Sequence, residues 1–221
     1  MKTIPIIAAT FVAMTVALKA ATLYGPTPYL QQSDSPFATE IQLGIVALET
    51  FEDNLFNIPG VTASAGSVIG PNGLTDSVDA DDGTIDGNGN NGRSFFSNNG
   101  SAGIRFTFTG ILPTKAGLVW TDGASTVSFQ AFDQDGVSLG VFPTHLADGV
   151  NFGETAEDRF YGAENATGIS SILIRNSTGG IEVDHLQFGA PVPEPASVAL
   201  LLFGGALCLW SRTRRAQQRN T

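Results

Sequence analysis

The feature that most constrains the fold is a repeated alternation of apolar and polar residues in the second half of the chain. Residues 105–109, 126–132 and 181–188 alternate in the way that half-buried strands do. Residues 117–120 and 171–174 are apolar on both faces, which is typical of fully buried strands. The chain between its two ends is therefore predicted to be built from strands.

Turn signals separate these segments and set the expected architecture. Glycine-containing turns are predicted at residues 71–73, 121–123, 133–136, 147–149 and 178–180. Residues 37–49 are ambiguous, and no other stretch has a clear helical period. Many short strands with regular turns predict an all-β fold, an antiparallel two-sheet sandwich with jelly-roll-like connections, over residues 21–190.

Both ends of the chain look like export signals. Lys2 precedes an apolar stretch at residues 4–18, and Ala20 suits a cleavage site, so residues 1–20 are predicted to form a secretory signal helix. An uncleaved anchor is the alternative. Near the other end, the apolar run 198–210 would form a hydrophobic helix of about 20 Å, short against a bilayer core of about 30 Å.

Residues 191–221 combine three parts in order: a hinge, this short transmembrane helix and a basic tail. The hinge contains Pro193, Glu194 and Pro195, and the tail contains Arg212, Arg214 and Arg215, which would hold the positive end in the cytoplasm. The alternative is a helix of the folded core. An apolar run that ends in an arginine cluster favours the membrane stop.

This C-terminal arrangement resembles the PEP-CTERM sorting signal, with Pro193, Glu194 and Pro195 as its recognition residues. The resemblance implies sorting by an exosortase after passage through the secretion translocon, in a Gram-negative bacterium that makes extracellular polysaccharide. It also implies transient anchoring in the inner membrane, and then a location at the cell surface or outside the cell.

The charge of the body excludes one class of partner. Six of the 11 Lys and Arg residues lie in the two ends, but only one of the 21 Asp and Glu residues does, which leaves five cations, 20 carboxylates and a formal charge near −15. Such a surface repels nucleic acid and attracts divalent cations. The single cysteine, Cys208, lies in the apolar C-terminal run, so the body must be held by its core, with or without a metal.

An acidic, glycine-rich stretch at residues 76–92 is the first candidate calcium site. Its candidate ligands are Asp79, Asp81, Asp82 and Asp86. Calcium takes six to eight oxygen ligands in flexible geometry, but the spacing falls short of an EF-hand. The alternative is a solvated, mobile loop.

A second resemblance concerns the body. Phe51-Glu52-Asp53 opens it, and residues 132–140 and 181–189 follow later, as in β-sandwich ectodomains of PEP-CTERM proteins, whose shape is broadly like carbohydrate-binding modules. This resemblance implies a structural calcium between Glu52 or Asp53 and Asp184. The alternative is that Glu52 and Asp184 point outward from edge strands.

Catalysis finds little support in the sequence. His145 and His185 form no zinc pattern, and His185 is interpreted as a strand residue on a polar face. Trp120, Phe152, Phe160 and Tyr161 either stack on sugars or, as we favour for the last two, pack in the core. We therefore predict a non-catalytic, exported surface or matrix protein, adhesive or polysaccharide-associated. The alternatives are a secreted carbohydrate-active hydrolase and a matrix filler without a specific ligand.

Overall fold

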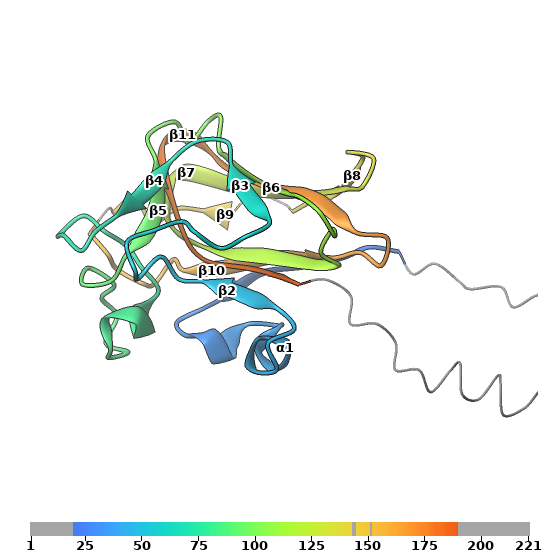
Figure 1. Cartoon of the computed structure of the whole chain (residues 1–221). Coiled ribbons are helices and arrows are strands. Elements are labelled where there is room, and N and C mark those ends of the chain that lie inside the picture. The colour runs from blue at the N-terminus through green and yellow to red at the C-terminus, as the bar shows by residue number, and fades with distance from the viewer. Residues whose placement is uncertain (1–19, 143–144, 151, 190–221) are drawn as a thin grey trace, which may run out of the picture.

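The computed structural model describes residues 20–142, 145–150 and 152–189 (Figure 1). The predicted sorting signal at 191–221, with Pro193, Glu194, Pro195 and the arginine stop, lies outside these residues, as does nearly all of the predicted signal peptide. Both remain predictions. Within the described part of the chain, no helix has the length and apolar character needed to cross a membrane.

Almost all of the regular secondary structure in the described chain is antiparallel β-strand, which confirms the all-β prediction. Helical structure is limited to the 3-10 turns η1 and η2 and the short helix α1, the latter within the ambiguous stretch 37–49. The elements are β1 Thr22–Pro28, η1 Gln32–Asp34, α1 Ala38–Gln42, β2 Ala47–Glu49, β3 Val61–Ala63, β4 Ser67–Ile69, η2 Asp79–Asp82, β5 Ser94–Ser97, β6 Ile104–Phe108, β7 Lys115–Asp133, β8 Ser138–Val141, β9 His145–Leu146, β10 Arg159–Glu164 and β11 Ile169–Gly189.

Two long strands, β7 and β11, pair with each other along most of their length and belong to both layers of the fold (Figure 1). In the lower layer, residues 115–120 of β7 lie between β10 and the end of β11, and β1 and β2 extend this layer. In the upper layer, residues 124–133 of β7 pair with β8, β9 and the start of β11. The start of β11 pairs in turn with β6, and β6 pairs with β3. The result is a β-sandwich-like arrangement.

The two turns predicted at residues 121–123 and 178–180 are wrong. Both stretches lie inside strands, β7 and β11, and the ladder passes from one layer to the other there through register shifts near Thr178 and Glu182. Gly123 allows this passage, since a Cβ on it would lie 1.8 Å from Asn176 Nδ2. The glycines bend and crowd the strands without ending them.

The main core fills the space between the layers. It contains a run of aromatic contacts among Phe51, Phe56, Phe95 and Phe106 at one end, and Phe129 stacked on Tyr161 at the other, with ring centroids 5.8 Å apart. The inward positions of β6 and the second half of β7 alternate with exposed or half-buried ones, as the sequence predicts.

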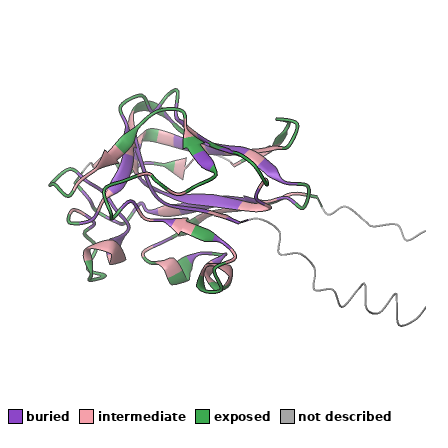
Figure 2. Cartoon of the chain, viewed as in Figure 1, coloured by how far each residue is buried: buried purple, intermediate pink, exposed green. Residues whose placement is uncertain are grey.

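A second, smaller core lies on the outer face of the lower layer. The segment between β1 and β2, which includes η1 and α1, packs its Tyr29, Phe37 and Val46 against Val119 and Phe160. Residues 116–121 of β7 are consequently buried on both faces, the continuous purple strand of Figure 2. This outer cover is the part of the fold that positions the candidate site.

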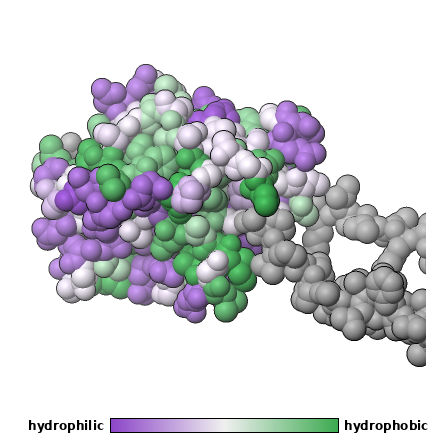
Figure 3. All heavy atoms as spheres, viewed as in Figure 1, coloured by the Kyte–Doolittle hydropathy of each residue, from purple (hydrophilic) through white to green (hydrophobic). Residues whose placement is uncertain are grey.

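The surface is mixed in character. Figure 3 shows hydrophilic side chains gathered on the left of the face in view, over the side of the molecule that carries β4, β5 and the acidic loop. Hydrophobic residues are more frequent near α1, where Leu43 is exposed.

Candidate metal centre

The acidic loop, residues 76–92, is fixed to the end of the sheet. The backbone N–H of Asp76 donates to Glu182 Oε1 at 2.8 Å, and that of Val78 donates to Asp184 Oδ2 at 2.9 Å. Ser77 Oγ closes the loop on itself by donating to the carbonyl of Gly89 at 2.8 Å. The side chains of Glu182 and Asp184 on β11 therefore hold the loop against the sheet.

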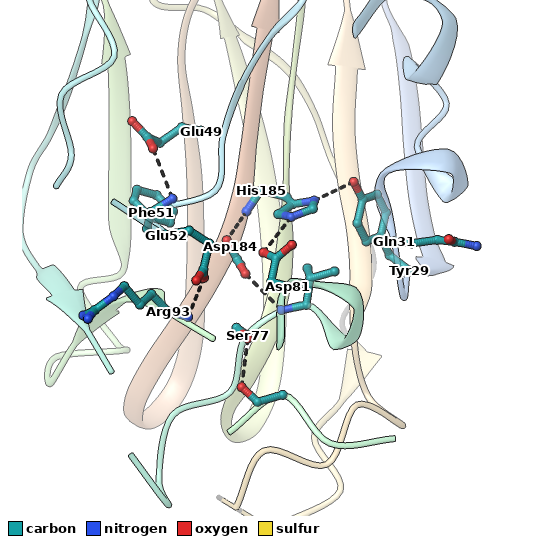
Figure 4. Close-up of polar contacts among 12 residues, drawn as sticks. Tyr29, Gln31, Glu49, Phe51, Glu52, Ser77, Asp81, Arg93, Asp184 and His185 are labelled. Atoms are coloured by element: carbon teal, nitrogen blue, oxygen red, sulfur yellow. Dashed lines mark hydrogen bonds and ion pairs between the residues drawn. The ribbon is translucent and has the colours of Figure 1, made fainter. Parts of the chain in front are cut away.

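Three side chains from the loop and from β11 converge at this contact. One ligand atom each of Asp81, Asp184 and His185 lies within 4.8 Å of the other two. His185 Nε2 is 2.9 Å from Asp81 Oδ2, and the side chains of His185 and Asp81 are 3% and 13% exposed. Figure 4 shows the three side chains pointing toward one another, with Glu52 beside Asp184.

The backbone conformation at His185 brings these neighbours together. In a regular strand Asp184 and His185 would point to opposite faces of the sheet. His185 instead has a φ of 45°, and the pairing of β11 with β7 shifts register between Asp184 and Gln187. Asp184 also accepts a hydrogen bond from the N–H of His185 at 2.6 Å. A non-glycine residue in the left-handed region is uncommon and costs free energy, so the surrounding contacts must hold it.

A buried hydrogen-bond network orients the imidazole. Gln187 Nε2 donates to Tyr29 Oη at 3.1 Å, and Tyr29 Oη lies 2.8 Å from His185 Nδ1. Ser35 Oγ donates to Gln187 Oε1 at 2.6 Å. A Tyr29 hydroxyl that accepts from Gln187 can either donate to Nδ1, with the ring proton on Nε2 toward Asp81, or accept from Nδ1–H, with Nε2 free to bind a cation.

The electrostatics of the site favour neutralisation of its carboxylates. Burial raises the pKa of Asp184 well above its ordinary value, and the negative charges of Asp81 and Glu52 add to this effect. Burial also raises the pKa of Glu52, although a hydrogen bond from the N–H of Arg93 opposes the change. A cation between these groups would offset the repulsion and the lost hydration together.

The predicted ligands separate into two groups. Asp81 and Asp184, which the sequence assigned to two different calcium sites, lie in one cluster, and Glu52 lies at its border. Asp184 is fully buried, so the alternative of an outward edge residue is wrong for it. Asp53 is exposed and accepts hydrogen bonds from Leu55 N and Asn57 Nδ2, outside the cluster.

The other loop carboxylates serve the loop itself. Asp79 accepts hydrogen bonds from Asp86 N, Gly87 N and Thr155 Oγ1, which uses its carboxylate to close the loop. Asp82 makes only long contacts of 3.4 Å to Thr84 N and Asn91 Nδ2, and Asp86 is exposed. These three residues do not join the cluster of described ligand atoms.

Sequence reasoning missed His185 and Tyr29. His185 lies in strand β11, as expected, but its expected place on a polar outer face is wrong, since it is 2% exposed and faces Asp81 and Tyr29. Its adjacency to Asp184 was the one available signal. Of the aromatic residues considered for sugar stacking, Trp120, Phe160 and Tyr161 are buried, and Phe152 alone of these is exposed.

An open hollow of about 430 Å³ borders the cluster. Asp81, His185, Gln31 and Thr50 are among the residues that line it. Solvent therefore reaches Asp81 from this side, while the imidazole and Asp184 lie behind it with almost no exposure.

Comparisons with known proteins leave the family open. No protein-family model matches the chain, and no curated protein matches it. Among solved structures, the chain is similar to the crystal structure of the enzymatically active domain of bacteriophage CBA120 tailspike protein 4, with 18% identity and a TM-score of 0.32. The match covers 63% of this chain and 20% of the tailspike chain, and a likeness this distant carries no conclusion about function.

Proposed function

We propose that this chain is an exported, non-catalytic surface or matrix protein whose folded body is fastened by a divalent cation at Asp81, Asp184 and His185. The observation that carries the metal part is the convergence of the three ligand atoms within 4.8 Å. These atoms come from a loop and a strand that are about 100 residues apart in sequence. A buried carboxylate and a half-buried one, together with a buried imidazole, form a donor set that a cation satisfies.

The donor set favours one class of ion. Ca²⁺ prefers six to eight oxygen ligands, whereas an imidazole with two carboxylates suits Zn²⁺ or Mn²⁺. His185 would bind through Nε2, with its proton moved to Nδ1 and donated to Tyr29 Oη, the outer hydrogen bond that metal-bound histidines commonly make. We therefore propose a transition-metal ion at this centre in place of the calcium expected from the sequence.

The ion would act as a cross-link. Asp81 belongs to the acidic loop, while Asp184 and His185 belong to the last strand, so a shared ion fixes the loop to the sheet. The described residues contain no cysteine, and hence no disulfide can do this. A ligand that binds only the folded state stabilises it in proportion to RT ln(1 + [L]/Kd).

Export and sorting are proposed from the two ends of the chain. The order of Pro193-Glu194-Pro195, apolar run and arginine tail supports recognition by an exosortase, and the stretch 1–20 supports passage through the secretion translocon. The two layers that share β7 and β11 support a jelly-roll-like sandwich as the exported part. Its acidic surface suits an association with extracellular polysaccharide through bridging cations.

The metal proposal is tested on the purified full-length chain, kept in detergent because of its apolar ends. Elemental analysis after dialysis against Zn²⁺ and Mn²⁺ should give one tightly held ion, and Asp81→Asn and His185→Gln should each lower affinity at least tenfold. Asp53→Asn, on a neighbouring exposed carboxylate, is the matched control and should bind as the parent does. Equal binding by all four proteins would refute the centre.

The sorting proposal is tested in a host that has an exosortase. Glu194→Ala should accumulate as unprocessed precursor in the inner membrane, whereas the parent chain and a body variant, Asp135→Ala, should be processed and released from it. Immunoblotting of membrane and surface fractions measures the processing. Normal processing of the Glu194 variant would contradict the assignment.

A further inference from the structure

A second group of buried oxygens lies at β7, which pairs with β11, and at the start of β10, the next strand of the lower layer. Asp158 immediately precedes β10, is fully buried, and neither oxygen of its carboxyl group has a hydrogen-bond partner among the described residues. Buried polar atoms are nearly always paired, and an unpaired one commonly marks a water or an ion. A carboxyl group with both oxygens unpaired in a closed interior calls for such a partner.

Two residues near Asp158 also carry buried side-chain oxygens without a hydrogen-bond partner among the described residues. Arg159 pairs with Trp120, so Asp158 lies beside Thr121 on the adjacent strand, and Thr121 Oγ1 is buried and unpaired. From the acidic loop above comes Asp76, which is 2% exposed and whose Oδ1 is likewise unpaired. Glu182 on β11 holds Asp76 in place by accepting its backbone N–H at 2.8 Å.

The charges of these groups act on one another. Burial raises the pKa of Asp158 well above its usual range, and among the surrounding charges that of Asp76 contributes most. Burial, followed by the charge of Glu182, raises the pKa of Asp76 to about 10. A cation between these carboxyl groups would offset both their mutual repulsion and their lost hydration, and it would give the unpaired oxygens of Asp158 a partner.

We propose that Asp158 and Asp76, assisted by the hydroxyl of Thr121, bind a calcium ion between the acidic loop and the strands β7 and β10. The donors are all oxygens, unlike those at His185, and hard oxygen donors select Ca²⁺ over Zn²⁺. Ca²⁺ takes six to eight oxygen ligands, so this proposal requires backbone carbonyls or water to supply the remaining ones. Glu182 acts as a positioning residue, because its hydrogen bond to the N–H of Asp76 sets the loop over Asp158. None of its ligands is shared with the His185 centre, although Asp184 of that centre is among the charges that raise the pKa of Asp158.

The test compares thermal unfolding of the full-length chain in detergent with excess EDTA and with Ca²⁺. At about 100 times Kd, Ca²⁺ should raise the Tm of the parent protein by roughly 5–10 °C. Asp158→Asn should abolish this shift and, in EDTA, should melt at or above the parent, because it removes an uncompensated buried acid. Asp76→Asn should behave in the same way, and the exposed Asp135→Asn should keep the full shift.

The outcomes separate this site from the first. If Asp158→Asn destabilises the protein equally in EDTA and in Ca²⁺, its role is purely structural and the calcium site is refuted. If the Ca²⁺ shift survives in Asp158→Asn but disappears in His185→Gln, the ion belongs to the His185 centre, and the second site is again refuted. If the parent protein binds no Zn²⁺ or Mn²⁺ but shows the full Ca²⁺ shift, the His185 centre alone is refuted.

Discussion

Replacing Asp79 by alanine should open the acidic loop and destabilise the protein strongly. Its buried carboxylate accepts hydrogen bonds from Asp86 N at 3.0 Å, Gly87 N at 2.9 Å and Thr155 Oγ1 at 3.1 Å. Hydrogen bonds to a charged acceptor contribute about 1.5–3 kcal/mol each. Water can replace the acceptor for the exposed N–H groups of Asp86 and Gly87, but Thr155 is 4% exposed. The expected loss is therefore about 2–4 kcal/mol of unfolding free energy.

The assay is urea and thermal unfolding followed by circular dichroism, with excess EDTA throughout so that no metal contributes. A loss of this size lowers Tm by roughly 4–15 °C in a domain of this length. Asp82→Ala is the matched control, since Asp82 lies in the same 3-10 turn but makes only contacts of 3.4 Å, and it should change stability by less than about 0.5 kcal/mol. Equal effects of the two substitutions would refute the reasoning.

Two further predictions concern the layers. The Lys115 hydrogen bond lowers the pKa of Glu40, so this pair stabilises the fold above the unfolded pKa near 4.5 and ceases to do so as the pH falls through the folded value. Glu40→Gln should thus cost about 0.5 kcal/mol at pH 7 and nothing near pH 2 by urea unfolding, and an equal cost at both would contradict the ion pair. Gly123→Ala would place a Cβ 1.8 Å from Asn176 Nδ2 and should lower the free energy of unfolding by about 1–3 kcal/mol. Gly73→Ala, with open space around it, is the control and should be near neutral. A neutral Gly123 variant would disprove crowding at the bend.

Much of the strand content could be predicted from the sequence because alternation is a local property. Residues 105–108 and 126–132 fall in β6 and β7, as their pattern indicates. The same local rules failed at Thr121–Gly123 and Thr178–Gly180, where turn-forming residues bend long strands without ending them. The two stretches pair with each other, as in Thr178 with Ala124 and Ile181 with Gly123, and this pairing keeps both within their strands. The sequence alone does not reveal the partner.

The candidate site could be predicted only in part. The acidic loop and Asp184 were both recognised as cation ligands, but their meeting was not, because it depends on how the loop folds back onto β11. His185 escaped because its left-handed conformation reverses the facing that strand periodicity assigns to it. Asp158 carried no signal at all, since one aspartate before a strand is common, and what distinguishes it is complete burial without a partner.

The sequence by itself determined that the body of this protein is a strongly acidic, strand-rich domain without disulfides, because charge, periodicity and cysteine content are properties of the chain. The tertiary structure alone decided which carboxylates are removed from water and which remain in it. That decision matters because an exposed aspartate is stable by itself, whereas a buried one needs a proton, a donor or a metal ion.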